Sequence, residues 1–169
     1  MGVTIHFEGQ LRDSADLDTL VQIVTDFANQ RGWPNWPILE NAKILHRVID
    51  EEKLDYFGPT SGIGVEPDEN AEPLSFEFDQ HLYVQGYCKT QFAGAVAHME
   101  VVALLRRLEP LFIELAVFDE AEYWDTGDPK RLMHHLDRVA EMIADEIRKD
   151  PTLRGPVRLP DGRILDLIN

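Results

Sequence analysis

The sequence predicts an α+β fold, in the form of a two-layer plait related to ferredoxin-like arrangements, with a mostly antiparallel sheet and its helices packed on one face. The first observation is a strict alternation of apolar and polar residues in several short segments, which is the period of a half-buried strand. The second is a set of longer segments whose apolar residues recur every three or four positions, as on an amphipathic helix. The two kinds follow one another as strand, helix, several strands, helix, strand, helix and hairpin. A chain of 169 residues fits one domain, which we expect to span residues 1–169.

The first two elements have clear boundary signals. Residues 3–8 alternate between apolar and polar side chains and predict a strand. A helix of about five turns follows, with Asp13 or Ser14 as its N-cap and Gly32 just past its end. The two prolines in residues 33–37 prevent the helix from continuing, so this segment is predicted as an ordered loop with both tryptophans packed down.

The middle of the chain predicts several strands. Residues 42–49 and 63–66 are strand candidates on either side of a segment, 57–62, whose glycines and proline are typical of turns. Residues 74–78 and 82–87 alternate more clearly, and the short segment between them suits a hairpin loop.

The last third predicts two helices, a strand and a hairpin. Residues 94–108 are so apolar that a helix there must be covered on most of its surface, and residues 112–118 read as a strand. Asp128 followed by Pro129 is a strong signal for the start of a long amphipathic helix. The chain then ends in a predicted hairpin at 157–166.

Composition excludes several classes of function. The 31 acidic and 16 basic residues give a formal charge of −15, which repels nucleic-acid phosphates and anionic membranes, so neither is an expected partner. Residues 50–88 hold ten Asp and Glu against one Lys, and residues 109–128 hold seven against no basic residue. The single cysteine, Cys88, excludes an internal disulfide and favours a cytoplasmic protein.

A candidate site follows from the predicted connection between two strands. If the strand ending near Lys89 and the strand 112–118 join one sheet through the apolar helix, the two strands are parallel and their C-terminal ends share an edge. That edge would gather Lys89, Thr90 and Gln91 with the acidic loop 119–128. Ligands favour such a position in open sheets with parallel strands.

Three segments also carry a resemblance. Residues 4–9, residues 89–94 with His98, and the loop 119–128 resemble a group of uncharacterised bacterial proteins in which the loop reads Asp-Glu-Gly-Gly-Tyr-Trp-Glu-Thr-Gly-Asp. This chain departs from that pattern at residues 121, 122 and 125. The resemblance implies no known activity.

The leading functional hypothesis is a binding module at this edge. Tyr123 and Trp124 would be aromatic anchors in an acidic rim, together with Lys89, Thr90 and Gln91, and would suit a cationic small molecule, peptide or protein. A separate polar sheet face, formed by residues such as His6 and Tyr87, would be open to solvent or to a second copy of the chain in a homodimer.

The alternative is a hydrolase assisted by a divalent metal. Asp119, Glu120 and Asp125 would be the metal ligands and His98 the general base. His98 stands out in an apolar helix, and the preferred explanation is a core histidine hydrogen-bonded to Asp119 or Glu120 as a pair that holds the fold.

Overall fold

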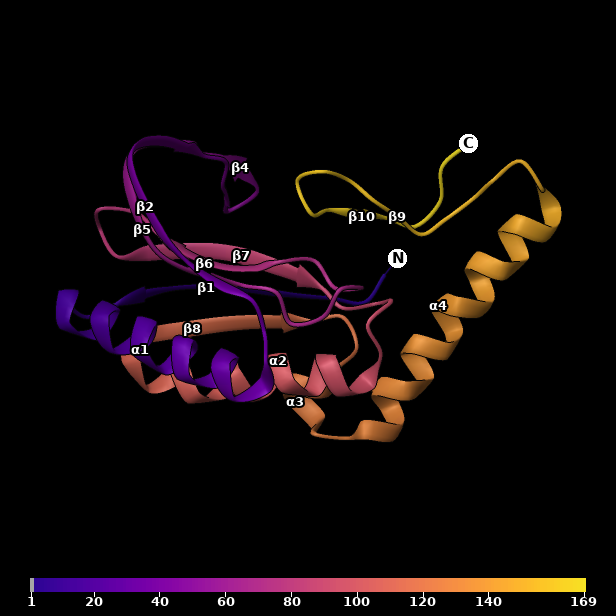
Figure 1. Ribbon diagram of the computed structural model, residues 1–169, viewed down its shortest axis with the longest axis horizontal. Helices are drawn as coiled ribbons and strands as arrows, with labels where there is room; N and C mark the ends of the chain where they lie inside the picture. The colour runs from indigo at the N-terminus through magenta and orange to yellow at the C-terminus, as the bar shows by residue number, and fades with distance from the viewer. Residues whose placement is uncertain (1) are drawn as a thin grey trace.

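The computed structural model describes residues 2–169 as an α+β fold with antiparallel sheets. The elements and their bounds are β1 (Thr4–Leu11), α1 (Ser14–Arg31), β2 (Asn35–Leu45), β3 (Val48–Ile49), β4 (Glu52–Lys53), β5 (Tyr56–Val65), β6 (Leu74–Phe78), β7 (Tyr83–Lys89), α2 (Ala95–Leu108), β8 (Phe112–Asp119), α3 (Tyr123–Thr126), α4 (Pro129–Lys149), β9 (Val157–Arg158) and β10 (Ile164–Leu165), with a short 3-10 turn before β8. Figure 1 shows their arrangement.

The strands form two three-stranded sheets, where the sequence predicts one. One has the order β7-β1-β8 and the other β2-β5-β6, and two small hairpins, β3-β4 and β9-β10, stand apart. The division falls between β6 and β7, although a short turn connects these strands. Within residues 2–169, the backbone hydrogen bonds between them lie near their ends, where the Asp79 amide donates to the Tyr83 carbonyl at 3.0 Å and the Glu72 amide to the Lys89 carbonyl at 3.0 Å.

The predicted crossover between β7 and β8 is confirmed. Strand β1 runs antiparallel to both of them and lies between them, so β7 and β8 are parallel to each other. Thr4 pairs with Lys89 and Ile5 pairs with Asp119, which places the C-terminal ends of β7 and β8 at the same edge. Helix α2 makes the connection along the sheet (Figure 1).

Helices α1 and α2 lie on the same side of the β7-β1-β8 sheet (Figure 1). The cap residues of α1 are as predicted, because Asp13 accepts a hydrogen bond from the Asp16 amide and Gly32 ends the helix in the left-handed conformation. Apolar side chains of both helices form the main core with the inward faces of the strands, including Ile5, Phe7, Leu20, Val24, Phe27, Val84, Val101, Leu104, Leu105 and Leu108. Helix α2 is less covered than predicted, since Val96 is exposed.

Two segments predicted as loop or turn are strands instead. Strand β2 begins at Asn35 and includes Pro37, which an edge strand tolerates because its free side needs no amide donor. Trp36 is therefore on a strand and partly exposed, while Trp33 packs edge-on against Phe27. In β5, Gly62 allows close approach to β6, since a Cβ there would lie 1.8 Å from the Phe76 carbonyl oxygen. Such glycines resemble turn signals in sequence.

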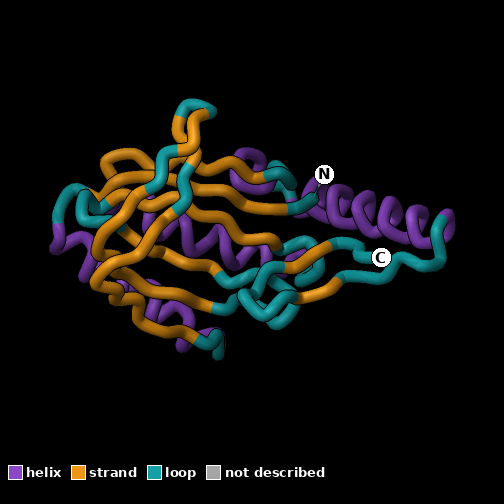
Figure 2. Tube along the Cα trace, turned by 90° about the horizontal axis from the view of Figure 1, so that it is seen from above, coloured by secondary structure: helices purple, strands orange, loops and turns teal. Residues whose placement is uncertain are grey.

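The C-terminal part begins at the predicted cap, where Asp128 accepts from the Lys130 amide and Pro129 opens α4. Leu132, Leu136 and Val139 pack with Val3 in a second apolar cluster. The helix then extends beyond the sheets, and the chain returns toward them through β9 and β10 (Figure 2). Of the helices that the structure describes, none has the length and apolar character to cross a membrane.

Candidate functional site

The sheet edge brings together three of the predicted site residues in a buried hydrogen-bond network. Thr90 follows β7, His98 lies one turn into α2, and Asp119 ends β8. The Thr90 hydroxyl is 2.7 Å from His98 Nδ1, and His98 Nε2 is 3.0 Å from Asp119 Oδ2. Since the Asp119 carboxylate accepts, His98 Nε2–H is the donor in that bond. All three side chains are buried, so the network joins three elements within the core.

Asp119 is held as a charged acceptor. Its Oδ1 accepts from the Ala121 amide at 2.8 Å and its Oδ2 also accepts from the Trp124 amide at 2.9 Å. Burial by itself raises the pKa of the Asp119 carboxyl, but the hydrogen bond and charge interaction with His98, followed by the two amides, lower it overall. The carboxylate thus orders the loop that follows β8, and its oxygens face inward.

The other polar residues predicted at this edge bind the protein itself. Lys89 Nζ donates to the Ile164 carbonyl at 3.0 Å and forms an ion pair with Asp166. The Gln91 side chain accepts from the Val3 amide at 3.0 Å and donates to Asp166 at 3.1 Å. Both residues therefore hold the β9-β10 region and the start of β1 against the sheet.

The predicted aromatic anchors are also engaged. Trp124 is 9% exposed and belongs to the main core. The Arg106 guanidinium stacks over the Trp124 ring, 3.4 Å from its centroid, and donates to the Trp124 carbonyl at 2.5 Å. Tyr123 is partly buried and meets the His98 ring edge-on. A hollow of about 380 Å³ lies beside them, but Arg106 already provides the cation that the indole face would bind.

The expected metal ligands are not assembled. In the described part of the chain, no three His, Cys, Asp or Glu side chains gather as a metal site would require. Asp119 is enclosed by its own hydrogen bonds, Glu120 Oε2 accepts from the Thr4 amide at 2.8 Å, and Asp125 is exposed. The buried position of His98 likewise leaves it no contact with a reacting molecule at this edge.

An open cavity lies instead on the face of the β7-β1-β8 sheet opposite the helices. We call it the sheet trough; its volume is about 480 Å³. It is lined by residues of all three strands, of β3 and of the segment between β2 and β3: His6, Phe7, Glu8, His46, Val48, Gln85, Gly86, Tyr87, Ala116, Val117 and Phe118. The Gln85 side chain bonds both the amide and the carbonyl of Val48, at 3.0 and 2.8 Å, and fixes that wall.

The trough combines exposed rings with carboxylates. Tyr87 and Phe118 are 51% and 66% exposed, and their ring centroids lie 6.2 and 5.9 Å from that of His6, which pairs with both residues across the strands. Glu8 faces the same space, and Glu120 Oε1 lies 3.6 Å from His6 Nε2. Within residues 2–169, neither Glu8 nor Glu120 forms an ion pair with a lysine or arginine. Aromatic rings beside carboxylates that no lysine or arginine neutralises favour the binding of a cation.

Glu8 is nonetheless held in a defined position. It accepts from the Tyr83 hydroxyl at 2.5 Å and from the Gln85 side chain at 3.1 Å. Burial, together with the hydrogen bond to Glu8, raises the pKa of Tyr83 to about 12, so the tyrosine remains a donor at neutral pH. The alternation in residues 3–8 predicted this polar face, whereas its closure by the distant Val48 segment has no local signal.

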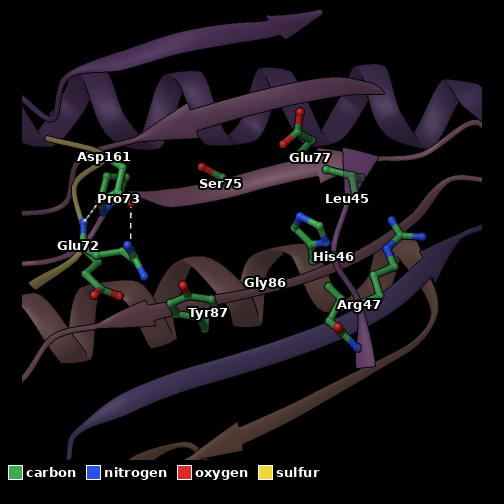
Figure 3. A pocket seen from close by; sticks show the side chains of 12 residues that line it. Leu45, His46, Arg47, Glu72, Pro73, Ser75, Glu77, Gly86, Tyr87 and Asp161 are labelled. Carbon is green, nitrogen blue, oxygen red and sulfur yellow. Dashed lines mark hydrogen bonds and ion pairs between the residues drawn. The ribbon is translucent and has the colours of Figure 1, made fainter. Parts of the chain in front are cut away.

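A second hollow, the strand groove, adjoins the trough where β6 and β7 separate. Its volume is about 250 Å³, and it shares His46, Gln85, Gly86 and Tyr87 with the trough. Figure 3 shows Ser75 and Glu77 on β6 across from Gly86 and Tyr87 on β7, with Glu72 and Asp161 at one end and His46 and Arg47 at the other.

A buried ion pair fixes that second end. Arg47 Nη1 lies 2.5 Å from Asp79 Oδ2, and both side chains are buried. Arg47 also donates to the Tyr83 carbonyl at 3.1 Å and stacks on the Tyr83 ring at 4.7 Å. Asp79 accepts from the His81 and Tyr83 amides. This contact ties the segment after β2 to the β6-β7 turn, and sequence reasoning did not single out either residue.

Comparison with known proteins adds no assignment: no family model, no curated protein and no solved structure matches the chain. The resemblance of residues 4–9, 89–94 and 119–128 to a bacterial group stays a prediction.

Proposed function

We propose that the protein is a non-catalytic binding module that takes a positively charged segment of a peptide or protein into the sheet trough. The observation that carries the proposal is the row of exposed rings, Tyr87, His6 and Phe118, flanked by Glu8 and Glu120, which have no lysine or arginine partner within the described chain. Cations gain from aromatic faces and from carboxylates together. The formal charge of −15 would also speed the encounter with a cationic partner.

The proposed partner is of the predicted cationic class, but its binding site is the sheet trough and not the sheet edge. The edge residues predicted to bind it, Thr90 and Gln91, are buried, and the Trp124 ring already carries Arg106. The trough begins next to that edge, since Glu120 lies beside His6. A peptide is favoured over a small cation because the trough crosses three strands and continues into the strand groove.

We also propose that the β7-β1-β8 sheet, with β6 beside β7 and helices α1 and α2 on one face, is a variant of the predicted ferredoxin-like plait. The sheet order β8-β1-β7, the hydrogen bonds that join the ends of β6 and β7, and the two helical connections support this. In such a plait the face without helices is free, which is where the trough lies.

The test is calorimetric titration with a capped hexapeptide of alternating Lys and Ala, and with its Glu–Ala counterpart. We expect the Lys peptide alone to bind, and its affinity to fall with added salt as the charges are screened. Glu8→Gln should weaken binding about threefold to tenfold, because it removes one partly screened charge interaction of about 1 kcal/mol. Glutamine can still accept the Tyr83 and Gln85 hydrogen bonds, so the trough should keep its shape.

A matched control separates the trough from the overall negative charge. Asp26→Asn removes one exposed carboxylate from α1, on the opposite side of the sheet, and should leave the affinity unchanged. Equal loss in the Asp26 and Glu8 variants would mean that the peptide binds by diffuse attraction, and the proposal would fail. In the described residues, no group of metal ligands favours metal-assisted hydrolysis.

A further inference from the structure

Glu72 is a buried carboxylate that no lysine, arginine or histidine of the described chain pairs with. It lies in the segment between β5 and β6 and is 7% exposed. Its Oε1 accepts from the Ile164 amide at 2.9 Å. Within residues 2–169, no lysine, arginine or histidine forms an ion pair with it, because Lys89 is bound to Asp166 and Arg163 to Asp161.

The second oxygen of Glu72 opens into the strand groove. In residues 2–169, every buried side-chain nitrogen or oxygen that is shut off from solvent has a hydrogen-bond partner. No described group donates to Glu72 Oε2, so this oxygen must remain in contact with solvent. The groove is the space that Glu72 lines, and Figure 3 shows its carboxylate at the same end as Tyr87.

A carboxylate in this position is unfavourable for the protein alone. Burial removes part of its hydration, and with no cationic partner that loss is offset only by the Ile164 amide and the remaining solvent contact of Oε2. A bound external cation would offset the lost hydration of the Glu72 carboxylate. The groove, at about 250 Å³, is smaller than the usual site for a drug-sized ligand and fits a single extended side chain.

We infer that Glu72 is the binding point for the primary ammonium of a lysine side chain in the bound segment. This inference rests on the proposed function and names the residue type that the groove selects. Lysine is favoured over arginine because Oε1 is already bonded to the Ile164 amide, which leaves one oxygen for a point charge rather than two for a guanidinium fork. The lysine stem would lie along the Tyr87 ring, and Ser75 lines the opposite strand.

The test uses n-butylammonium as a probe for the lysine side chain, with n-butylguanidinium and n-butanol for comparison. Backbone amide shifts of Ile164, Gly86 and Tyr87 are followed by NMR. We expect n-butylammonium to shift these amides with millimolar affinity, to bind more tightly than n-butylguanidinium, and n-butanol to leave them unchanged. Absence of these shifts, or tighter binding of the guanidinium, would overturn the assignment.

Two variants sharpen the test. Glu72→Gln should weaken n-butylammonium binding about tenfold, which corresponds to about 1.4 kcal/mol. Glutamine can keep the bond to the Ile164 amide, so an unchanged spectrum of the free variant shows that the fold is intact. Asp26→Asn is again the control, because it removes one exposed carboxylate from α1, away from the groove, and the affinity should stay within about twofold. Equal affinity of wild type and Glu72→Gln would refute the inference.

The Lys–Ala peptide distinguishes this failure from that of the proposed function. If Glu8→Gln weakens peptide binding and Glu72→Gln does not, the sheet trough is supported as the binding site and the lysine position at Glu72 is wrong. If the peptide does not bind and n-butylammonium does, the proposed function is wrong, and with it the peptide as the occupant of Glu72. If both variants weaken peptide binding, the result supports the proposed function and the lysine position at Glu72.

Discussion

Replacing His98 with alanine should destabilise the protein strongly without touching the trough. The change removes the hydrogen bonds to Thr90 and Asp119, whose side chains are both buried. Each buried polar group left short of a partner costs about 1–3 kcal/mol, and the void left by the ring adds to this, so we expect a loss of about 3–5 kcal/mol.

Urea unfolding followed by far-UV circular dichroism measures this loss as a lower midpoint at constant slope. Thr90→Val keeps the volume and removes only the hydroxyl, and should cost about 1–2 kcal/mol. His134→Ala is the surface control on α4 and should change the free energy of unfolding by less than about 0.5 kcal/mol. A loss below about 1 kcal/mol for His98→Ala would refute a fold-holding network at this edge.

Three further changes test the described contacts. The pKa of Asp119 is lowered in the folded state, so its contribution to stability is present above its unfolded pKa of about 4 and disappears as the pH falls through the lower folded value. The difference in unfolding free energy between wild type and Asp119→Asn should therefore be constant near neutral pH and shrink in acid; a difference that grew in acid would contradict the sign. Arg47→Met should cost about 3–5 kcal/mol in chemical denaturation because Asp79 is left buried and unpaired, and a neutral effect would show that the pair is dispensable. Gly62→Ala should prevent β5 from pairing with β6, seen as loss of soluble folded protein, since its Cβ would overlap the Phe76 carbonyl; a fully stable variant would contradict that close approach.

Local signals predicted the elements whose boundaries depend on neighbouring residues. Asp13 and Gly32 cap α1, and Asp128 with Pro129 starts α4, because caps act within one turn of the chain. The prediction that β7 and β8 end at one edge is confirmed. It was possible because the handedness and length of a crossover restrict the topology.

The predictions that were wrong concern features that depend on residues distant in sequence. Pro37 and Gly62 look like loop residues until it is known that β2 is an edge strand and that β6 lies against β5. The contact of Arg47 with Asp79, which ties the segment after β2 to the β6-β7 turn, joins residues 32 positions apart in sequence. No local pattern indicates such a pairing.

The candidate site was predicted in part. The sequence indicated that His98 would meet Asp119 or Glu120, and it left open whether the pair would hold the fold or act in catalysis; the partner is Asp119, and both residues are buried. It could not show that Arg106 would cover the Trp124 ring, because this depends on how α2 packs against α3. The sequence did not single out Glu72, because the absence of a cationic partner is a property of the folded protein.

The most direct test is to map the bound Lys–Ala hexapeptide by amide chemical-shift changes across the whole protein. The account predicts that the changes gather on β7, β1 and β8 around Tyr87, His6 and Phe118 and extend into the strand groove toward Ile164. Changes centred on Tyr123 and Trp124, or the absence of saturable changes anywhere, would contradict it.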